Sequence, residues 1–529
     1  MKIVCKSLLT PFALCLTSAA VSSQEQEAVA EAAVKAATTP GHESDDMMSL
    51  RSDPTDAQIT DAIEDELQSD PAVVTTRIDT VTADGIVTLT GSVDNLLAKQ
   101  RAARLAMAVR GVKAVVNRIA VTDSGRSNRA IRFEVGQALL LDPATEAYKI
   151  DMDVTDGQKV TLTGDVESYA EKRLAERVAS GVRGVRSLDN QLTVDFKTDR
   201  LDFEVKNDIQ GQLRWNRFLD GARVTVQLND GHASFRGVVG SAAEKYELER
   251  TAWVAGVKSV DVSGVGVERW ARDPDLRANK YASKSDSEVQ QAVESALRHD
   301  PRVLSFNVQV AAEGGAVTLR GTVDNLKAKR AAGQNAENCV GVWRVNNRVK
   351  VRPETLLEDA AIAVAIEQAL LRDPWVEGFQ ITVGVKNGTA TLDGSVDNTF
   401  DRARADDVAA RVIGVERVRN QLTITDPTLY GYDPHVEWWY SPTEFDWYNI
   451  YAPVVSRSAD NVIRTDIRNK LWWSPFVDEG QVTVKVEGGC ATLSGTVDSL
   501  AESMAAIENA YEGGAVRVVN DLTVGGDSQ

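Results

Sequence analysis

The stretch Val87-Thr-Leu-Thr-Gly91-Ser-Val-Asp-Asn95 decides the fold, because close versions of it recur along the chain. Two of them are Val317-Thr-Leu-Arg-Gly321-Thr-Val-Asp-Asn325 and Ala390-Thr-Leu-Asp-Gly394-Ser-Val-Asp-Asn398. The central glycine occurs six times, and we expect a structural role for Gly91, Gly164, Gly237, Gly321, Gly394 and Gly495. Successive glycines are 73, 73, 84, 73 and 101 residues apart, which indicates six copies of one structural unit.

Upstream of each central glycine, apolar residues recur every four positions, as at Ile59, Ile63 and Leu67 in copy one. A step of four keeps these residues on one face of an α-helix. In four copies Asp-Pro follows, at Pro71, Pro143, Pro301 and Pro374, and proline disfavours helix in the residue before it. The sequence therefore predicts an amphipathic first helix that ends at the proline.

Alternating apolar residues and a glycine turn such as Asp84-Gly85 then predict a β-hairpin whose second strand contains the central glycine. An Ala- and Val-rich second helix and a last strand complete each copy, with Gly-Val between them in the first five copies. We expect the recurring acids Asp94, Asp324, Asp397 and Asp498 to cap the second helix. The fold class is α+β: six tandem α-β-β-α-β units, each a three-stranded sheet packed with two helices on one face.

The helix ending in Asp-Pro, the Thr-Leu-x-Gly-x-Val strand and the closing Gly-Val…Asn segment together resemble the BON domain, a family named for bacterial OsmY and nodulation proteins. The resemblance covers all six copies, although copy three lacks the Asp-Pro and the closing Asn. It implies a module of the bacterial envelope that contacts phospholipid, in the context of envelope maintenance, transport or osmotic stress.

The copies and the segments between them can be delimited along the chain. We expect a signal peptide at 1–23, an acidic disordered tether at 24–54, BON-like units at 55–122, 126–195 and 200–267, a linker at 268–285, BON-like units at 286–352 and 357–426, an aromatic-rich insertion at 427–456 and a last unit at 458–525. The longer connections suggest a grouping of three units, then two, then one.

The start of the chain has the pattern of a secretory signal. Lys2 and Lys6 precede a short apolar run, and small residues follow it. We therefore expect a periplasmic or otherwise exported protein. Removal of the signal leaves Cys339 and Cys490, which fit two unpaired small residues better than a disulfide.

The insertion before copy six is dense in aromatic residues, with nine between Tyr430 and Tyr451. Two interpretations are open. The segment either binds a partner or an interface, or packs its rings on copies five and six.

Motifs for an enzyme are missing from the sequence. It contains no Walker A loop, no G-x-S-x-G and no H-E-x-x-H, and its histidines, His42, His232, His299 and His435, have no metal-ligand spacing. We expect no catalytic residues, no metal and no cofactor. The net charge of −18 also argues against a nucleic-acid partner, which requires basic surface.

Local charge distinguishes copies one and four, which each carry six Lys or Arg residues after the central glycine. The candidate lipid-binding residues are Lys99, Arg101, Arg104, Lys113, Lys327, Lys329 and Arg330. These residues form either an ordinary solvated face or a contact with anionic phospholipid headgroups. The sequence predicts a non-catalytic exported protein that binds anionic membrane surfaces. The alternative is a periplasmic scaffold or chaperone that binds envelope proteins through its sheet faces and the aromatic insertion.

Overall fold

The computed structural model describes residues 53–524, except 71, 74–76, 143–144, 146–148, 196–199, 217–218, 220–222, 273–283, 301, 304–306, 354–356, 377 and 426–458. The expected signal peptide, the insertion, and most of the tether and of the linker lie outside the described residues. Contacts divide the chain into Met1–Pro54 and Thr55–Gln529, and all elements named below belong to the second unit.

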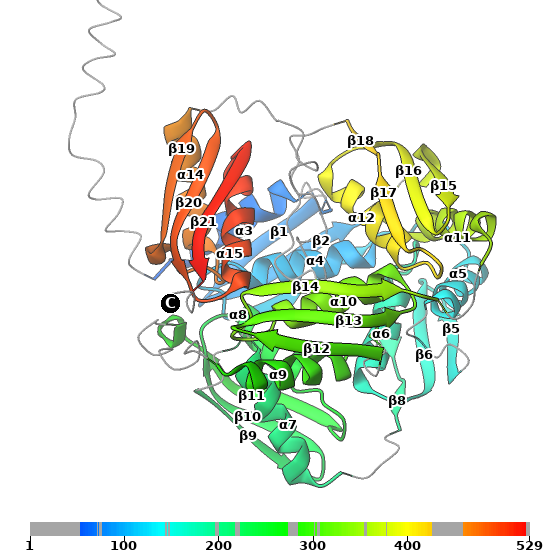
Figure 1. The fold of residues 1–529 in the computed structure, drawn as a ribbon, viewed down its shortest axis with the longest axis horizontal. Helices are drawn as coiled ribbons and strands as arrows, with labels where there is room; N and C mark the ends of the chain where they lie inside the picture. Colours follow the sequence, from blue (N-terminus) through cyan, green and yellow to red (C-terminus); the bar gives the residue numbers. More distant parts are fainter. Residues whose placement is uncertain are drawn as a thin grey trace, which may run out of the picture. The chain divides into compact units, whose positions relative to one another are not determined.

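Copy one shows the plan of every unit (Figure 1). Its elements are α3 (Asp56–Ser69), β1 (Ile78–Ala83), β2 (Ile86–Val93), α4 (Leu96–Met107), β3 (Ala114–Asn117) and β4 (Ala120–Val121). The central strand β2 pairs antiparallel with β1 and parallel with β3 and β4. The predicted α-β-β-α-β order is confirmed, and the last strand is interrupted in this copy.

Copies two and three repeat this order. Copy two contains α5 (Asn128–Leu141), β5 (Ile150–Thr155), β6 (Lys159–Val166), α6 (Tyr169–Ser180), β7 (Ser187–Asn190) and β8 (Thr193–Val194). Copy three contains α7 (Asp202–Trp215), β9 (Val224–Asn229), β10 (His232–Val239), α8 (Ala242–Thr251) and β11 (Ser259–Val267). Copy three therefore has the complete fold despite its diverged sequence.

The last three copies follow the same plan. Copy four contains α9 (Asp286–Arg298), β12 (Val308–Glu313), β13 (Ala316–Val323), α10 (Leu326–Glu337) and β14 (Arg344–Val351). Copy five contains α11 (Asp359–Arg372), β15 (Ile381–Lys386), β16 (Thr389–Val396), α12 (Thr399–Ala410), β17 (Arg417–Asn420) and β18 (Thr423–Ile424). Copy six contains α14 (Asp460–Trp473), β19 (Val482–Glu487), β20 (Cys490–Val497), α15 (Leu500–Glu512) and β21 (Arg517–Val524).

The first helix forms as its pattern predicts. In α3 the Thr55 side chain accepts a hydrogen bond from the backbone N–H of Gln58, which completes a capping box at the start of the helix. The three apolar residues at steps of four are all buried, and the helix ends at Ser69, with Asp70 as its cap. The equivalent apolar triplets are buried in the other five copies.

The central glycine is required by the close approach of the two hairpin strands. All six central glycines have positive φ angles, from 112° to 140°. A Cβ atom at any of them would lie between 1.8 and 2.1 Å from a backbone carbonyl oxygen just before the first strand, such as that of Arg77 in copy one. Only glycine tolerates both the positive φ angle and the short distance to the carbonyl oxygen.

The second helix is capped by a different residue from the one that we expected. Asn95, not Asp94, is the N-cap of α4, and its side chain accepts a hydrogen bond from the N–H of Ala98 at 2.8 Å. In the other copies the caps are likewise asparagine or serine: Ser168, Ser241, Asn325, Asn398 and Ser499. The acids lie one position too early, outside the first turn, so the capping prediction was wrong by one residue.

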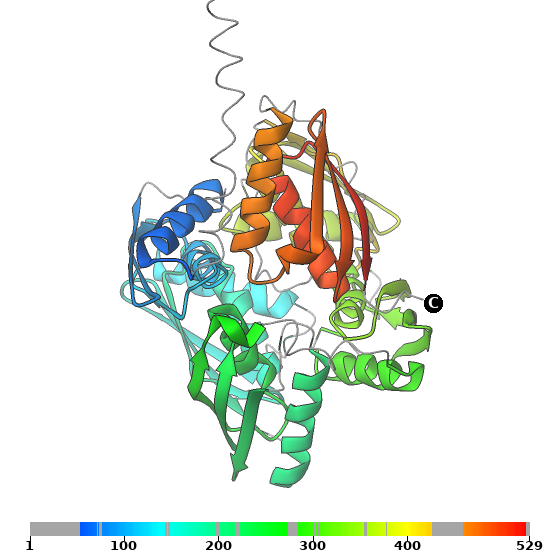
Figure 2. The same cartoon turned by 90° about the vertical axis from the view of Figure 1, so that its left-hand side faces the viewer.

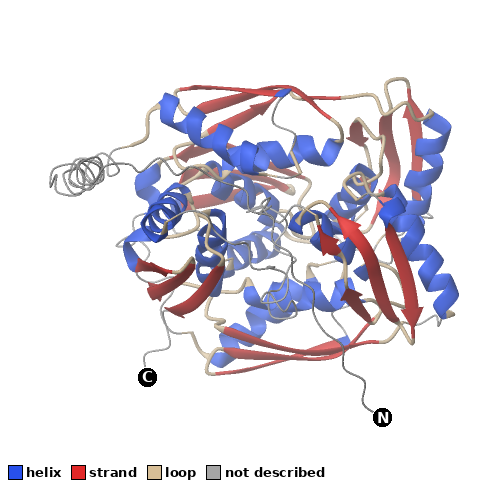
Figure 3. Cartoon of the chain, turned by 90° about the horizontal axis from the view of Figure 1, so that it is seen from above, coloured by secondary structure: helices blue, strands red, loops and turns tan. Residues whose placement is uncertain are grey.

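Both helices of a copy cover the same face of its sheet, as Figure 2 shows for α14 and α15 in copy six. Within Thr55–Gln529, the helices of different copies pack against one another and the sheets present their other faces outward (Figure 3). The buried cores of copies one and two merge into one cluster, and those of copies four and five merge into another. The outer sheet faces are therefore among the surfaces left to solvent.

A recurring backbone hydrogen bond joins the copies in pairs. In each case the donor is the residue before the glycine that follows the second helix of one copy (Gly111, Gly184 or Gly341), and the acceptor is the last residue of the first helix of another. The three bonds, from donor N–H to acceptor carbonyl, are Arg110 to Trp473 (3.1 Å), Arg183 to Arg372 (2.9 Å) and Val340 to Trp215 (3.0 Å). Copy one thus pairs with copy six, copy two with copy five, and copy four with copy three.

This pairing corrects the grouping of three, two and one that the connections suggested. The length of a connection limits how far a copy can reach. It does not determine which copies meet, and in these three contacts an N–H of one copy binds the helix-end carbonyl of another copy that is not in every case its neighbour along the chain. Cys339 lies in the contact between copies three and four, and both Cys339 and Cys490 are free cysteines, as predicted.

Candidate functional site

The predicted lipid-binding residues of copy one do not share one environment. Arg101 is fully buried, and its Nε lies 2.8 Å from both carboxylate oxygens of Asp70. Its guanidinium carbon also lies 4.7 Å from the centre of the Phe400 ring in copy five. Lys99 and Arg104 are half-buried, and Lys113 is exposed. Arg101 therefore forms its ion pair within copy one and also contacts copy five.

Two of the predicted residues of copy four make ion pairs with the second helix of copy five. Lys327 pairs with Asp407, and Arg330 Nη1 lies 2.6 Å from a carboxylate oxygen of Asp406. Both carboxylates are nearly inaccessible to solvent, and Lys329 is half-buried. Of the seven predicted residues, Lys113 is therefore the one classed as exposed, and Arg101, Lys327 and Arg330 lie at contacts between copies.

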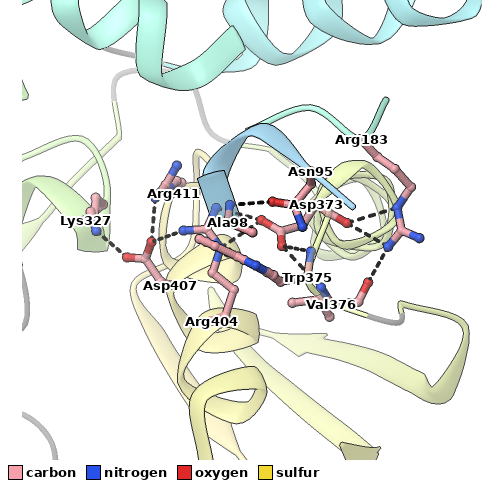
Figure 4. A network of polar contacts seen from close by, with 10 residues as sticks. All are labelled: Asn95, Ala98, Arg183, Lys327, Asp373, Trp375, Val376, Arg404, Asp407 and Arg411. Carbon is pink, nitrogen blue, oxygen red and sulfur yellow. Dashed lines mark hydrogen bonds and ion pairs between the residues drawn. The ribbon is translucent and has the colours of Figure 1, made fainter. Parts of the chain in front are cut away.

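Asp407 is the centre of a network of buried charges (Figure 4). Its carboxylate pairs with Lys327, with Arg411 at 2.6 Å and with Arg404 at 3.7 Å. Burial by itself would raise the pKa of Asp407, but Arg411, Lys327 and Arg404 outweigh it and hold the pKa well below its usual range. Burial lowers the pKa of Lys327 to about 7, although Asp407 opposes the shift.

The same network reaches copy two. Arg404 also lies 2.7 Å from the Asp373 carboxylate, whose other oxygen accepts a hydrogen bond from the backbone N–H of Trp375. The guanidinium of Arg183 in copy two donates to the backbone carbonyls of Asp373 and Val376 at 2.8 and 2.9 Å. These charged side chains therefore form the contacts between copies two, four and five.

The exposed cations of copy four lie on its outer sheet face. Valines 345, 349 and 351 of β14 are buried, so the alternation of the strand turns Arg344, Arg348 and Lys350 outward. Arg320 of β13 stands opposite Arg348 in the parallel pairing and is also exposed. No hydrogen bond or ion pair joins these four side chains to another residue that the structure describes. We call Arg320, Arg344, Arg348 and Lys350 the copy-four basic face.

Other outer faces differ in character. In copy two the outward positions include Asp151, Asp153, Asp165 and Asp189, with Lys159 paired to Asp189 at 2.8 Å. In copy one, Val81 and Val116 flank Thr88 in one row across the sheet, and Ile86 lies in the next row. These three apolar residues are 63%, 38% and 45% exposed, respectively. We call Val81, Ile86 and Val116 the copy-one apolar face.

Sequence reasoning counted Arg344, Arg348 and Lys350 among the six basic residues of copy four but chose its lipid-binding candidates from the second helix. The alternation Arg344-x-Asn346-x-Arg348-x-Lys350, with valines between, could have indicated an outward row on a strand. The burial of Lys327 and Arg330 could not be found in this way. Their partners lie about 80 residues away and become neighbours only when copies four and five pack together.

Among the residues that the structure describes, no three His, Cys, Asp or Glu side chains are grouped so that they could hold a metal ion. The described helices include none that is long and apolar enough to cross a membrane.

Comparison with known sequences identifies the repeated unit. The family model for the BON domain matches residues 55–123, 127–195, 202–268, 285–353, 358–426 and 459–526. The chain belongs to the BON domain family. The six matches include the diverged copy three, so the resemblance inferred from the sequence is confirmed for all six BON domains.

Two curated relatives match parts of the chain. Osmotically-inducible protein Y of Escherichia coli (strain K12) is 30% identical over 144 residues, which cover 26% of this chain and 71% of that protein. Outer membrane lipoprotein DolP of Haemophilus influenzae is 25% identical over 177 residues, which cover 32% of this chain and 90% of that protein.

A solved structure also matches part of the chain. It is the C-terminal domain of CdsD, described as a structural protein of the type III secretion system of Chlamydia trachomatis. The match covers 40% of this chain and 100% of that chain at 19% identity, and its TM-score of 0.12 is too low to support any argument about fold or function.

Proposed function

We propose that this protein is a non-catalytic BON-domain protein of the bacterial envelope, and that it binds anionic phospholipid surfaces through the copy-four basic face. Membership of the family supports the general role. The names of the two relatives, an osmotically inducible protein and an outer membrane lipoprotein, support an envelope location and a part in osmotic stress. The predicted signal peptide at 1–23 is consistent with export.

The observation that carries the proposal is the copy-four basic face itself. It places four exposed cations on two neighbouring strands, and Glu313 is the one acidic residue at an outward position of the same sheet. Each Lys or Arg near an anionic membrane contributes about 1 kcal/mol at low salt. Because no described residue pairs with these cations, the protein loses no internal ion pair when the face binds phosphate groups.

The experiment is flotation of the mature protein with phosphatidylglycerol-containing and neutral vesicles. We expect binding to the anionic vesicles at low salt and its loss at high salt. The double variant Arg344→Glu with Arg348→Glu should lower the binding constant at least about tenfold, because it removes two favourable contacts and adds two repulsive ones.

The matched control is Arg417→Glu with Arg419→Glu, at exposed positions on the corresponding strand of copy five. It changes the net charge by the same amount and should leave most of the binding intact. Equal losses in the two variants would mean that the protein responds to overall charge, and the assignment to copy four would be wrong.

A protein-binding role is the second candidate, and the copy-one apolar face favours it. Exposed Val81, Ile86 and Val116 could cover an apolar segment of an unfolded client. If so, the double variant Val81→Asp with Val116→Asp should abolish suppression of aggregation of reduced α-lactalbumin by the protein. Unchanged suppression would reject this surface. The aromatic insertion, the other part of the original alternative, lies outside the described residues.

A further inference from the structure

A cavity of about 140 Å³ lies where copies two and five pack together. The end of α5, the end of α6, and the helices α11 and α12 with the turn after α12 supply its walls. Most of its lining is apolar, and it includes Leu141, Val178, Val182, Ala369, Val408 and Val412. Ligand sites usually measure about 300–1,000 Å³, so this one suits only a small molecule or a short chain.

Five charged residues also line the cavity, and four of them are engaged with one another or with Asp407. Arg404 pairs with Asp373 at 2.7 Å, and Arg411 pairs with Asp407 at 2.6 Å. The negative charge of Asp142 contributes to the stabilisation of the Arg411 cation. The exception is the remaining cation, Arg372.

Arg372 is 9% exposed, and no hydrogen bond or ion pair joins its guanidinium to another described residue. Burial lowers the pKa of Arg372, and the Glu134 carboxylate, which itself lies 3.6 Å from Arg126, offsets this only in part. The guanidinium nitrogens of Arg372 keep some contact with water, so this largely buried cation, which has no side-chain partner among the described residues, is open to an incoming anion. Next to an apolar cavity, the favourable anion is one that also carries an apolar chain.

We propose that this cavity is a binding site for a small anionic amphiphile, with its carboxylate or phosphate group on Arg372 and its short apolar chain along Leu141, Val178 and Val412. The site is distinct from the copy-four basic face, which lies on the outer side of another copy. It would detect single soluble molecules, whereas the basic face would contact a membrane surface. Binding would also add contacts between copies two and five.

The test is calorimetric titration of the full mature protein with octanoate and with octyl phosphate, each compared with octanol and octylamine. We expect at least one of the two anions to bind, and the neutral and cationic chains to bind at least tenfold more weakly. Binding of octanoate alone or octyl phosphate alone would define the head group as carboxylate or phosphate. Inorganic phosphate that bound as tightly as octyl phosphate would overturn the proposal, because the apolar wall would then contribute nothing.

Two variants locate the site. Arg372→Leu should weaken binding of the anion at least tenfold, and Ala369→Phe should abolish it by filling the cavity. Arg419→Leu, at an exposed position of the same copy, should bind as the unaltered protein does. Thermal melting of each variant confirms folding, and Arg372→Lys, which keeps the charge, should retain part of the affinity. Unchanged binding in Arg372→Leu, or no anion binding by the unaltered protein, would overturn the proposal.

Discussion

Replacement of Asp407 by asparagine should destabilise the protein by about 3–5 kcal/mol, the usual cost of removing one partner from a buried ion pair. The Asp407 side chain is 4% exposed and is shared by Lys327, Arg404 and Arg411. Without this negative charge, Arg411 loses its ion-pair partner, and Lys327 loses the group that opposes the lowering of its pKa by burial. Hydrogen exchange should report the loss as faster opening of α10 and α12, together with a lower melting temperature.

A matched control separates this effect from the loss of any aspartate in copy five. Asp393 lies at an exposed outward position of β16, and Asp393→Asn should change stability by no more than about 0.5 kcal/mol. Addition of Lys327→Met to Asp407→Asn should restore part of the stability, because it removes a buried amino group that has lost its partner. If Asp407→Asn were as stable as Asp393→Asn, the network would not hold copies four and five together.

The second large effect is expected at a central glycine. Gly394→Ala should cost at least about 3 kcal/mol, because it combines an unfavourable φ angle with a steric clash. The residue has a φ angle of 135°, and a Cβ atom there would lie 2.1 Å from the carbonyl oxygen of Gln380. The strands β15 and β16 must move apart to accept the methyl group, so the unfolding transition should shift to a lower urea concentration.

Gly384 provides the control in the same sheet. A Cβ atom at this residue of β15 would have no neighbour within 4 Å, and its φ angle is not in the left-handed region. Gly384→Ala should therefore leave stability unchanged or raise it slightly, since alanine restricts the unfolded chain. Similar losses in the two variants would contradict the assignment of the cost to the close approach of the hairpin strands at Gly394.

Most of the fold within a copy could be predicted because its signals are local. The spacing of Ile59, Ile63 and Leu67 indicates the buried face of a helix, and Asp84-Gly85 indicates the hairpin. The Asp94 prediction failed by one residue, since sequence alone does not show where the helical dihedral angles begin. How the copies pair could not be predicted, because the hydrogen bond from Arg183 to Arg372 joins residues 189 positions apart.

The same limit explains the outcome for the candidate site. Charge counting identified copy four, but it does not distinguish Lys327 and Arg330, which pack against copy five, from the outward-facing residues of β14. Lys327 and Arg330 pair with aspartates of copy five, and no sequence pattern near either pair of residues indicates that the two copies pack together. Arg344 and Arg348 are exposed by the alternation of a strand, which is a local pattern. This pattern could have been used to predict them as surface residues.

The most direct test of the central claim is to find which sheet face meets the membrane. A single cysteine with an environment-sensitive fluorophore can be placed at Thr322 of copy four or Thr163 of copy two, both exposed outward positions, after replacement of Cys490 by serine. Anionic vesicles should shift the emission of the label at 322 and leave the label at 163 unchanged. A response at 163, or equal responses at both positions, would contradict membrane binding through the copy-four basic face.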